Sequence, residues 1–418
     1  MIRKKGIEFS LINLIFDIYG RFKQMSPIIS FVIPVYNNEY YLGNAVFSIL
    51  RQLESIKEEA IEVIIVDDGS TDRTGIIADE LAEKDSRIHV IHQENKWIFG
   101  SMNSGVKNAV GEYVYILNSD DLLVKGTVPL LLSTIDEYDN PDVIWTKVVW
   151  ELVDDEQRVL DSRDFNEKVK EDFYCKNRNE VHKKWFFLQE SGLATNQANL
   201  YKKALLEKHS FREDVYGADT ILNLEIADEV NSMVILKEPV YRYLEYKRKG
   251  FNASLKYYDY THDMFNEIMN MSLKLYEKWL IPKNVYIDFV ILKRLRNLTI
   301  EIESMLNENC KLSIDSKLEK VFSVSADPEL REKAWGVGRE REYESRILNG
   351  SNKILKNSNY CSSEYGFVKV LTAGLPLDYW GEINAEVIDL EALKAAVNDP
   401  LNKDKIGKIY YSDVLQSK

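Results

Sequence analysis

Three short apolar runs between residues 28 and 121 each end in polar side chains, and this pattern constrains the fold more than any other feature of the chain. The runs, 28–35, 63–66 and 113–117, are rich in β-branched and aromatic residues, as strands covered on both faces are. Between the first two runs, apolar residues recur at helical spacing, namely Leu42, Ala45, Val46, Ile49, Leu50 and Leu53. The sequence therefore predicts a β-α-β unit in a mostly parallel sheet.

The polar residues that follow these runs are expected to lie at one edge, because parallel sheets bind ligands at the carboxyl ends of their strands. The runs lead into Tyr36 and Asn37, into 67–72 and into 118–121. Adjacent carboxylates, as in the last two segments, repel each other unless a cation or hydrogen-bond donors lie beside them. Mg²⁺ or Mn²⁺ takes one or two carboxylates while phosphates and water complete its coordination. We expect a metal-bound diphosphate at this edge, and a solvated acidic turn is the alternative.

With these motifs, the chain resembles the bacterial family 2 (GT-A fold) inverting glycosyltransferases over residues 28–255. The motifs that carry the resemblance are, in order, 34–37, 66–72, Asn95, 102–105, 109–113 and 118–121. The resemblance implies a Rossmann-like GT-A catalytic domain with a mostly parallel sheet, an α/β fold. It also implies Mn²⁺ or Mg²⁺ as cofactor and a nucleotide-sugar donor, with a UDP-sugar expected. The expected acceptor is a hydroxyl of a cell-surface glycan or of a lipid-linked glycan.

The resemblance also assigns roles to individual residues. Asp120 and Asp121 are expected to hold the metal. The expected donor contacts are Pro34, Tyr36, Asn37, Asp67, Asn95, Asn103, Asn118, Ser119, Arg248 and Ser254. Arg248 and Ser254 belong to a basic loop that would close on the diphosphate, since arginine binds phosphate oxygens in a fork. Asn118 stands where the family usually has Asp.

Asp219 opens a predicted helix, and the resemblance implies that it is the catalytic base. The family has a Glu-Asp pair here, and Ala218 replaces the Glu in this chain. A carboxylate in the first turn of a helix is also favoured by the helix dipole, so a structural role is the alternative. Glu213 and Asp214 are the nearest rivals for the role of base.

The segment 145–187 is aromatic and charged and is expected to form the acceptor side. Aromatic rings offer flat apolar faces to a sugar, although more often they fill cores. The candidate rings are those of Trp150, Tyr174, Trp185, Phe186 and Phe187, and His182 and Glu190 are candidate polar contacts.

The chain length of 418 residues allows two or three domains. We expect an amphipathic segment over 1–25, the GT-A domain over 26–255 with a nucleotide half (26–125) and an acceptor half (126–255), an added mainly helical module over 256–345 and a mixed region over 346–418. The helical module would cover the catalytic domain, form a homo-oligomer contact or hold the acceptor, and the sequence does not choose among these. No donor-binding motif follows Ser254.

Charge and cysteine usage limit the partners and the compartment. With 54 basic and 67 acidic residues, the net charge of −13 argues against a nucleic-acid partner. Three widely spaced cysteines predict neither a disulfide framework nor a cysteine zinc site, which favours a reducing cytoplasm. The apolar run in 1–25 is too short to span a membrane. As an amphipathic helix it would lie on the inner face of the membrane or pack on protein.

Two other classes of function stay open. A nucleotidyltransferase would be expected to carry a basic, glycine-rich phosphate loop after the first strand, and residues 36–39 are not one. A catalytically silent scaffold that binds sugars or nucleotides is favoured by Asn118 and Ala218, which depart from the family pattern. Nucleotide release from a panel of nucleotide sugars in Mn²⁺ separates an enzyme from such a scaffold.

Overall fold

The computed structural model describes residues 27–52, 60–195, 198–246, 256–325, 327–339, 341–343, 346–347 and 354. The chain divides into two compact units, one up to Gly250 and one from Phe251 onward. The predicted amphipathic helix, the basic loop with Arg248 and Ser254, and nearly all of 346–418 lie outside the described residues.

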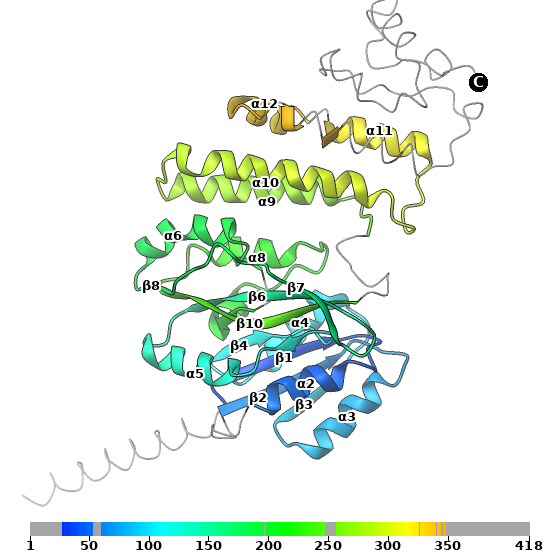
Figure 1. The fold of residues 1–418 in the computed structure, drawn as a ribbon, viewed down its shortest axis with the longest axis vertical. Coiled ribbons are helices and arrows are strands. Elements are labelled where there is room, and N and C mark those ends of the chain that lie inside the picture. Colours follow the sequence, from blue (N-terminus) through cyan, green and yellow to red (C-terminus); the bar gives the residue numbers. More distant parts are fainter. Residues whose placement is uncertain are drawn as a thin grey trace, which may run out of the picture. The chain divides into compact units, whose positions relative to one another are not determined.

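The described part of the first unit contains one ten-stranded sheet (Figure 1). Along its main path the strands are β3 (Ile88–His92), β2 (Ile61–Asp67), β1 (Ile29–Val35), β4 (Tyr113–Ile116), β9 (Leu200–Lys202), β6 (Val143–Val153), β10 (Met233–Tyr246) and β5 (Leu122–Leu123). Off this path, β7 (Val159–Asp164) pairs with β6, and β8 (Phe173–Cys175) pairs with β10. The first four strands are mutually parallel, β6 and β10 are parallel, and β9 is antiparallel to its neighbours. The predicted α/β fold with a mostly parallel sheet is confirmed.

Helices cover both faces of this sheet, so the side chains of β1 and β2 are buried along the whole length of each strand. The helices of this half are α2 (Leu42–Leu50), α3 (Thr74–Lys84), α4 (Trp97–Asn108) and α5 (Thr127–Glu137). Helix α4 packs on β1 and β2, and a Cβ added to Gly105 would lie 2.2 Å from Cγ1 of Val32. The glycine therefore permits the close approach of helix and strand.

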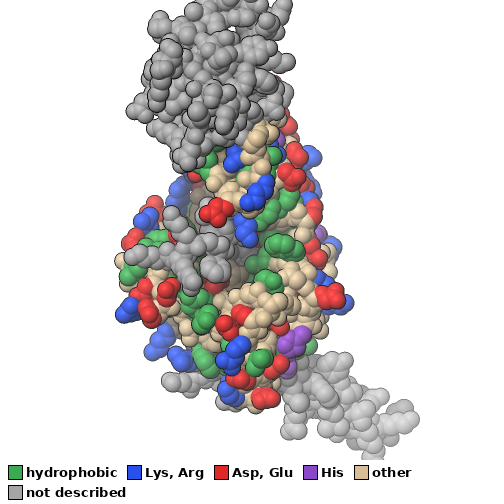
Figure 2. Space-filling view, turned by 90° about the vertical axis from the view of Figure 1, so that its right-hand side faces the viewer, with side chains coloured by type: hydrophobic (Ala, Val, Ile, Leu, Met, Phe, Trp, Pro, Cys, Tyr) green, Lys and Arg blue, Asp and Glu red, His purple; other side chains and the backbone are tan. Residues whose placement is uncertain are grey.

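The second half of this unit is built around β6 and β10, which pair from Val143 and Met233 to Val153 and Tyr246. Its helices are α6 (Arg178–Glu190), α7 (Lys203–Lys208) and α8 (Ala218–Ile226). In Figure 1, α6 and α8 lie on one side of these strands and α5 on the other. On the face drawn in Figure 2, acidic and basic side chains are interspersed over the described surface.

The described part of the second unit is helical, as predicted, with α9 (Thr261–Lys278), α10 (Lys283–Ser304), α11 (Ile314–Ser325) and α12 (Pro328–Gly336). Pro282 precedes the first residue of α10, where its missing N–H costs no helical hydrogen bond. None of the helices in the described ranges combines the length and apolar composition that a membrane crossing needs.

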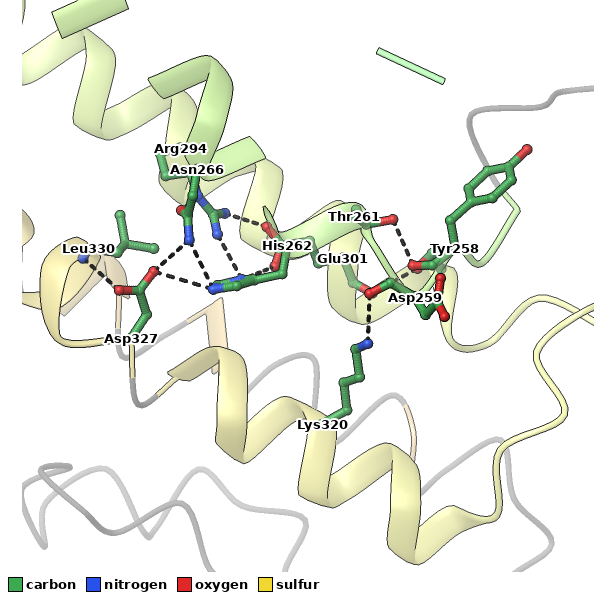
Figure 3. Close-up of polar contacts among 11 residues, drawn as sticks. Tyr258, Asp259, Thr261, His262, Asn266, Arg294, Glu301, Lys320, Asp327 and Leu330 are labelled. Carbon is green, nitrogen blue, oxygen red and sulfur yellow. Dashed lines mark hydrogen bonds and ion pairs between the residues drawn. The ribbon is translucent and has the colours of Figure 1, made fainter. Parts of the chain in front are cut away.

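A buried network of charged side chains joins α9, α10 and the residue before α12 (Figure 3). His262 Nδ1 lies 2.8 Å from Glu301, and its Nε2 lies 3.3 Å from Asp327. Arg294 pairs with Glu301 and donates from Nε to Asn266 Oδ1 at 2.6 Å. Burial alone would lower the pKa of His262, but its hydrogen bonds to Asp327 and Glu301 raise the pKa to about 9. At neutral pH the network therefore contains a charged histidine.

Candidate active site

The sheet brings the three predicted polar segments to one edge. Strands β2, β1 and β4 are adjacent and parallel, so their carboxyl ends point the same way. Val35, the last residue of β1, is paired with Asp67, the last residue of β2. The turn 118–121 follows the end of β4, where Ile116 is paired with Val32. This edge is the position at which parallel α/β sheets bind ligands.

The end of β1 is joined to the turn that follows β2. Asn37 has a positive φ of 48°, a conformation that asparagine tolerates better than most residues. Its Oδ1 accepts from the backbone N–H of Thr71 at 2.7 Å, and its own N–H donates to Ser70 Oγ at 3.0 Å. Pro34 is part of β1, and the side chain of Tyr36 beyond it is 50% exposed. Of these predicted donor contacts, Tyr36 presents an accessible ring, while Asn37 already bonds to protein.

Two buried carboxylates end β2 and hold the loop that follows β3. Asp67 Oδ2 lies 2.9 Å from His92 Nδ1, and this contact, followed by that of Asp79, raises the pKa of His92. Asp68 Oδ1 accepts from Gln93 Nε2 at 2.6 Å and from the N–H of Lys96 at 2.9 Å. The carboxylates at the end of β2 are therefore paired with protein donors.

Asn95 lies in the loop that Asp68 holds. Its Oδ1 accepts from the N–H of Trp97 at 3.2 Å. Gly69 has a φ of +75°, and a Cβ there would lie 3.2 Å from the backbone nitrogen of Asn95. The turn after β2 thus packs closely on this loop, which requires glycine at position 69.

Asn103 of α4 holds the segment that precedes α8. Its Oδ1 accepts from the N–H of Phe211 at 2.9 Å, and its Nδ2 donates to the carbonyl of Phe211 at 2.8 Å and to Glu213 Oε1 at 3.0 Å. Both amide atoms therefore bond to protein. The role of Asn103 as a donor contact stays a prediction.

Asp121 is buried and accepts three hydrogen bonds from other protein groups. The hydroxyl of Tyr241 donates to Oδ2 at 2.6 Å, the N–H of Leu244 donates to Oδ1 at 2.8 Å, and Asn118 Nδ2 donates to Oδ2 at 3.2 Å. Burial, and then the charge of Asp120, raise the pKa of Asp121 well above its usual range. The bonds from Tyr241 and Leu244 attach Asp121 to β10, and the bond from Asn118 lies within the turn 118–121.

Asp120 has different surroundings. Burial raises the pKa of its half-buried carboxyl group, and within the described ranges no other residue donates a hydrogen bond to that group. Oδ1 of the neighbouring Asn118 is buried without a hydrogen-bond partner in the same ranges. Oxygen atoms of this kind are ligands that Mg²⁺ and Mn²⁺ prefer. Asp120 and Asn118 therefore fit a divalent cation, although the described residues contain no group of three or more metal-ligating side chains.

The predicted base, Asp219, lies half-buried in the first turn of α8. Its Oδ1 accepts from the N–H of Thr220 at 2.7 Å. Its two rivals lie in the loop before the helix and are both paired, because Asp214 forms an ion pair with Arg212 at 2.7 Å and Glu213 accepts from Asn103. The role of Asp219 as base stays a prediction.

The predicted acceptor side needs a correction. Trp185 is fully buried and packs edge-on against Trp145, with the ring centroids 5.7 Å apart, so it fills the core and offers no face to a sugar. Tyr174 is 41% exposed, and Trp150 donates from Nε1 to Glu245 at 2.8 Å. Glu190, a candidate polar contact, is paired with Lys168 at 2.7 Å, and His182 Nε2 lies 3.7 Å from Asp228.

The sequence did not predict which residues from distant parts of the chain bond to the turn 118–121. Asn38 Nδ2 donates to Ser119 Oγ at 2.9 Å, and the hydroxyl of Tyr246 donates to the carbonyl of Asp120 at 3.0 Å. These contacts join residues 81 and 126 positions apart, so no local pattern reports them. The one feature of the sequence that could have indicated these contacts is the high proportion of tyrosine in β10.

Comparisons with known proteins agree with this architecture. Residues 30–198 match the family described as glycosyl transferase family 2. Glycosyltransferase GlyG of Streptococcus pneumoniae serotype 4 is 41% identical over 121 residues, which are 29% of this chain and 39% of that protein. Uncharacterized glycosyltransferase EpsJ of Bacillus subtilis is 29% identical over 233 residues, which are 53% of this chain and 62% of that protein. The chain thus spans less than two thirds of the length of either relative.

Among solved structures, S. aureus TarS 1–349 in complex with UDP-GlcNAc is 18% identical to this chain. The match covers 83% of this chain and 98% of that chain, with a TM-score of 0.49.

Proposed function

Because residues 30–198 match the family described as glycosyl transferase family 2, we propose that the chain transfers a sugar from a nucleotide-diphosphate sugar to a hydroxyl group of a glycan. The observation that carries this proposal is the turn 118–121. It places a half-buried carboxylate, that of Asp120, at the sheet edge that binds ligands. Within the described residues no cationic side chain pairs with this carboxylate, and a metal-bound diphosphate would offset the cost of its partial burial.

The donor would lie along the ends of β1 and β2. Tyr36 has an exposed ring that can stack on a nucleobase, and Asp67 offers a carboxylate at the adjacent strand end. A UDP-sugar is the donor expected from the resemblance. Arg248 and Ser254 would bind the diphosphate.

Asp120 would hold Mn²⁺ or Mg²⁺, with Asn118 Oδ1 and Ser119 in the same turn. When bound, such an ion offsets the negative charge that grows on a leaving diphosphate. Asp121 would keep the turn in place through its bonds to Tyr241 and Leu244. In this proposal Asp120 is the metal ligand and Asp121 holds the turn in place, whereas the sequence predicted that both bind the metal.

Asp219 would take the proton from the acceptor hydroxyl while that oxygen attacks the anomeric carbon and the bond to the diphosphate breaks. This single displacement inverts the configuration at that carbon. The acceptor would be a cell-surface or lipid-linked glycan, and its contacts would come from the half of the unit built around β6 and β10.

The test is nucleotide release from a panel of nucleotide sugars, with Mn²⁺ and with EDTA, in the presence of glycan acceptors. We expect release from one donor, dependent on the metal and abolished in Asp120→Asn. Binding of a nucleotide sugar without release under any condition would instead support the silent scaffold. Absence of binding to every donor by folded protein would contradict both.

A further inference from the structure

The turn 118–121 carries the candidate metal ligand. It accepts hydrogen bonds from three residues of strand β10. Tyr241 and Leu244 bond to the side chain of Asp121. Tyr246, the last residue of β10, bonds instead to the backbone carbonyl of Asp120. The two carboxylates of the turn are therefore positioned by different residues, and Tyr246 is the one that acts on Asp120.

Tyr246 is itself fixed by two residues from distant parts of the chain. Gln157, in the turn between β6 and β7, donates from Nε2 to the Tyr246 hydroxyl at 2.6 Å. The ring of Tyr246 packs on that of Tyr41, with centroids 4.4 Å apart. A tyrosine hydroxyl can accept one hydrogen bond while it donates another. The hydroxyl thus accepts from Gln157 and donates to the carbonyl of Asp120. It links the hairpin of β6 and β7 to the turn 118–121.

Gln157 is held as firmly as the tyrosine. Its Oε1 accepts from Asn44 Nδ2 of α2 at 2.8 Å, so both atoms of its amide are bonded. Its backbone adopts a φ of +60°, which is uncommon for glutamine and costs free energy. The amide of Gln157 therefore connects α2 to the hydroxyl of Tyr246.

We infer that Gln157 and Tyr246 form a positioning pair that sets the orientation of Asp120 for a divalent cation. Within the described ranges, no other residue donates a hydrogen bond to the carboxylate of Asp120, so its direction depends on how its backbone is held, and Tyr246 bonds to that backbone. A cation at one or two carboxylates demands a narrow geometry, especially Mg²⁺. Residues that orient a ligand in this way typically change metal affinity when they are removed. This inference rests on the proposed function, because it takes Asp120 as the metal ligand.

The test removes the hydroxyl of Tyr246 and keeps its ring. In Tyr246→Phe the packing on Tyr41 stays, while the bonds to Asp120 and Gln157 are lost. Binding of Mn²⁺ would be measured in the presence of UDP by the electron paramagnetic resonance signal of free Mn²⁺, and UDP affinity by calorimetry. Loss of one or two hydrogen bonds predicts a dissociation constant for Mn²⁺ that is about three- to tenfold higher. UDP binding in EDTA should not change.

Two further variants separate positioning from general damage. Tyr243→Phe removes a hydroxyl from the same strand, one that makes no hydrogen bond within the described ranges, and should leave Mn²⁺ affinity unchanged. Gln157→Ala keeps the backbone strain and removes the amide, and should weaken Mn²⁺ binding less than Tyr246→Phe. Because Gln157 acts through Tyr246, the double variant should bind Mn²⁺ no more weakly than Tyr246→Phe alone.

The outcomes are distinguishable. If the wild-type protein binds Mn²⁺ with UDP and Tyr246→Phe binds it equally well, the positioning pair is wrong and the proposed function stands. If Gln157→Ala and Tyr246→Phe weaken Mn²⁺ binding additively, the link between them is wrong. If the wild-type protein shows no Mn²⁺ binding with UDP, the metal part of the proposed function fails and the inference fails with it.

Discussion

The hydroxyl of Tyr241 lies 2.6 Å from Oδ2 of Asp121 and joins the polar turn after β4 to the middle of β10. The adjacent Asp120 receives no such bond to its carboxylate within the described ranges. Two carboxylates that are neighbours in the sequence therefore have different partners. One is saturated by protein donors, and the other has oxygen atoms that can bind a cation.

This difference predicts opposite effects on stability for the two amide variants, beginning with Asp121→Asn. The asparagine cannot accept from Leu244, Tyr241 and Asn118 together, because one of its two polar atoms is a donor. A buried donor left without its acceptor costs about 1–3 kcal/mol, so the free energy of unfolding should fall by that order. Calorimetric unfolding would measure it. An unchanged melting temperature would show that the buried bonds do not anchor the turn.

Asp120→Asn should leave stability unchanged or slightly higher, because it removes one of two adjacent charges that burial disfavours. Its effect should appear in ligand binding instead. Calorimetry with UDP in Mn²⁺ and in EDTA should show an affinity that depends on the metal in the wild-type protein and not in this variant. Retained metal dependence in Asp120→Asn would reassign the ligand to another residue of the turn.

The sequence predicted the sheet edge because that prediction needed only local patterns. Apolar runs and helical spacing locate β1, α2 and β2 to within a few residues. Strand β2 begins two residues earlier than expected, at Ile61, because Glu62 interrupts the apolar run. Glu62 is nevertheless buried, and its carboxylate accepts from Ser30 and from the N–H of Val110. A charged residue inside a strand is acceptable only when such partners exist, and the sequence does not show them.

The different surroundings of Asp120 and Asp121 were not predictable, because they depend on contacts between residues about half of the first unit apart in the sequence. Tyr241 and Leu244 reach Asp121 because β10 pairs with β5, which directly follows Asp121 in the chain. The burial of Trp185 in the core was not predictable for a related reason. An aromatic residue on an amphipathic helix reads the same whether its ring faces a sugar or the core, and here it packs on Trp145.

The helical unit should lose stability as the pH rises. The pKa of His262 in the folded state, about 9, is above the ordinary value of 6.5. Its contribution is therefore fully present below about pH 6.5 and is lost as the pH rises through about 9. The shift corresponds to at most about 3 kcal/mol, and Arg294, the nearby cation, opposes it.

The measurement is thermal unfolding of the full chain for wild type and His262→Gln. The difference between them should be large near pH 6.5 and should shrink toward pH 10. His89→Gln, which changes a histidine whose side chain is 58% exposed in the first unit, is the matched control for the substitution itself. A constant difference across this range would mean that Glu301 and Asp327 do not hold a charged histidine.

The catalytic prediction is that Asp219→Asn lowers turnover about 10²- to 10⁴-fold, the range typical for loss of a general base. The amide keeps the shape of the side chain and its hydrogen bond from Thr220, so UDP affinity should change little. Asp219 also lies in the first turn of α8, where a negative charge is favoured by about 0.3–1 kcal/mol. The melting temperature should therefore fall only slightly. Turnover would be followed as nucleotide release at saturating donor and acceptor.

Amide variants of Glu213 and Asp214 are the matched controls. They test whether catalysis needs the carboxylate at position 219 or only an acidic residue in this region. Asp214→Asn removes an exposed ion pair with Arg212, and such pairs contribute little. Glu213→Gln can keep its contact with Asn103, because the amide oxygen still accepts. Both should retain most of the activity. If Asp219→Asn folds and transfers sugar at a near-normal rate, while Asp214→Asn is inactive, the base lies in the loop before α8 and not in the helix.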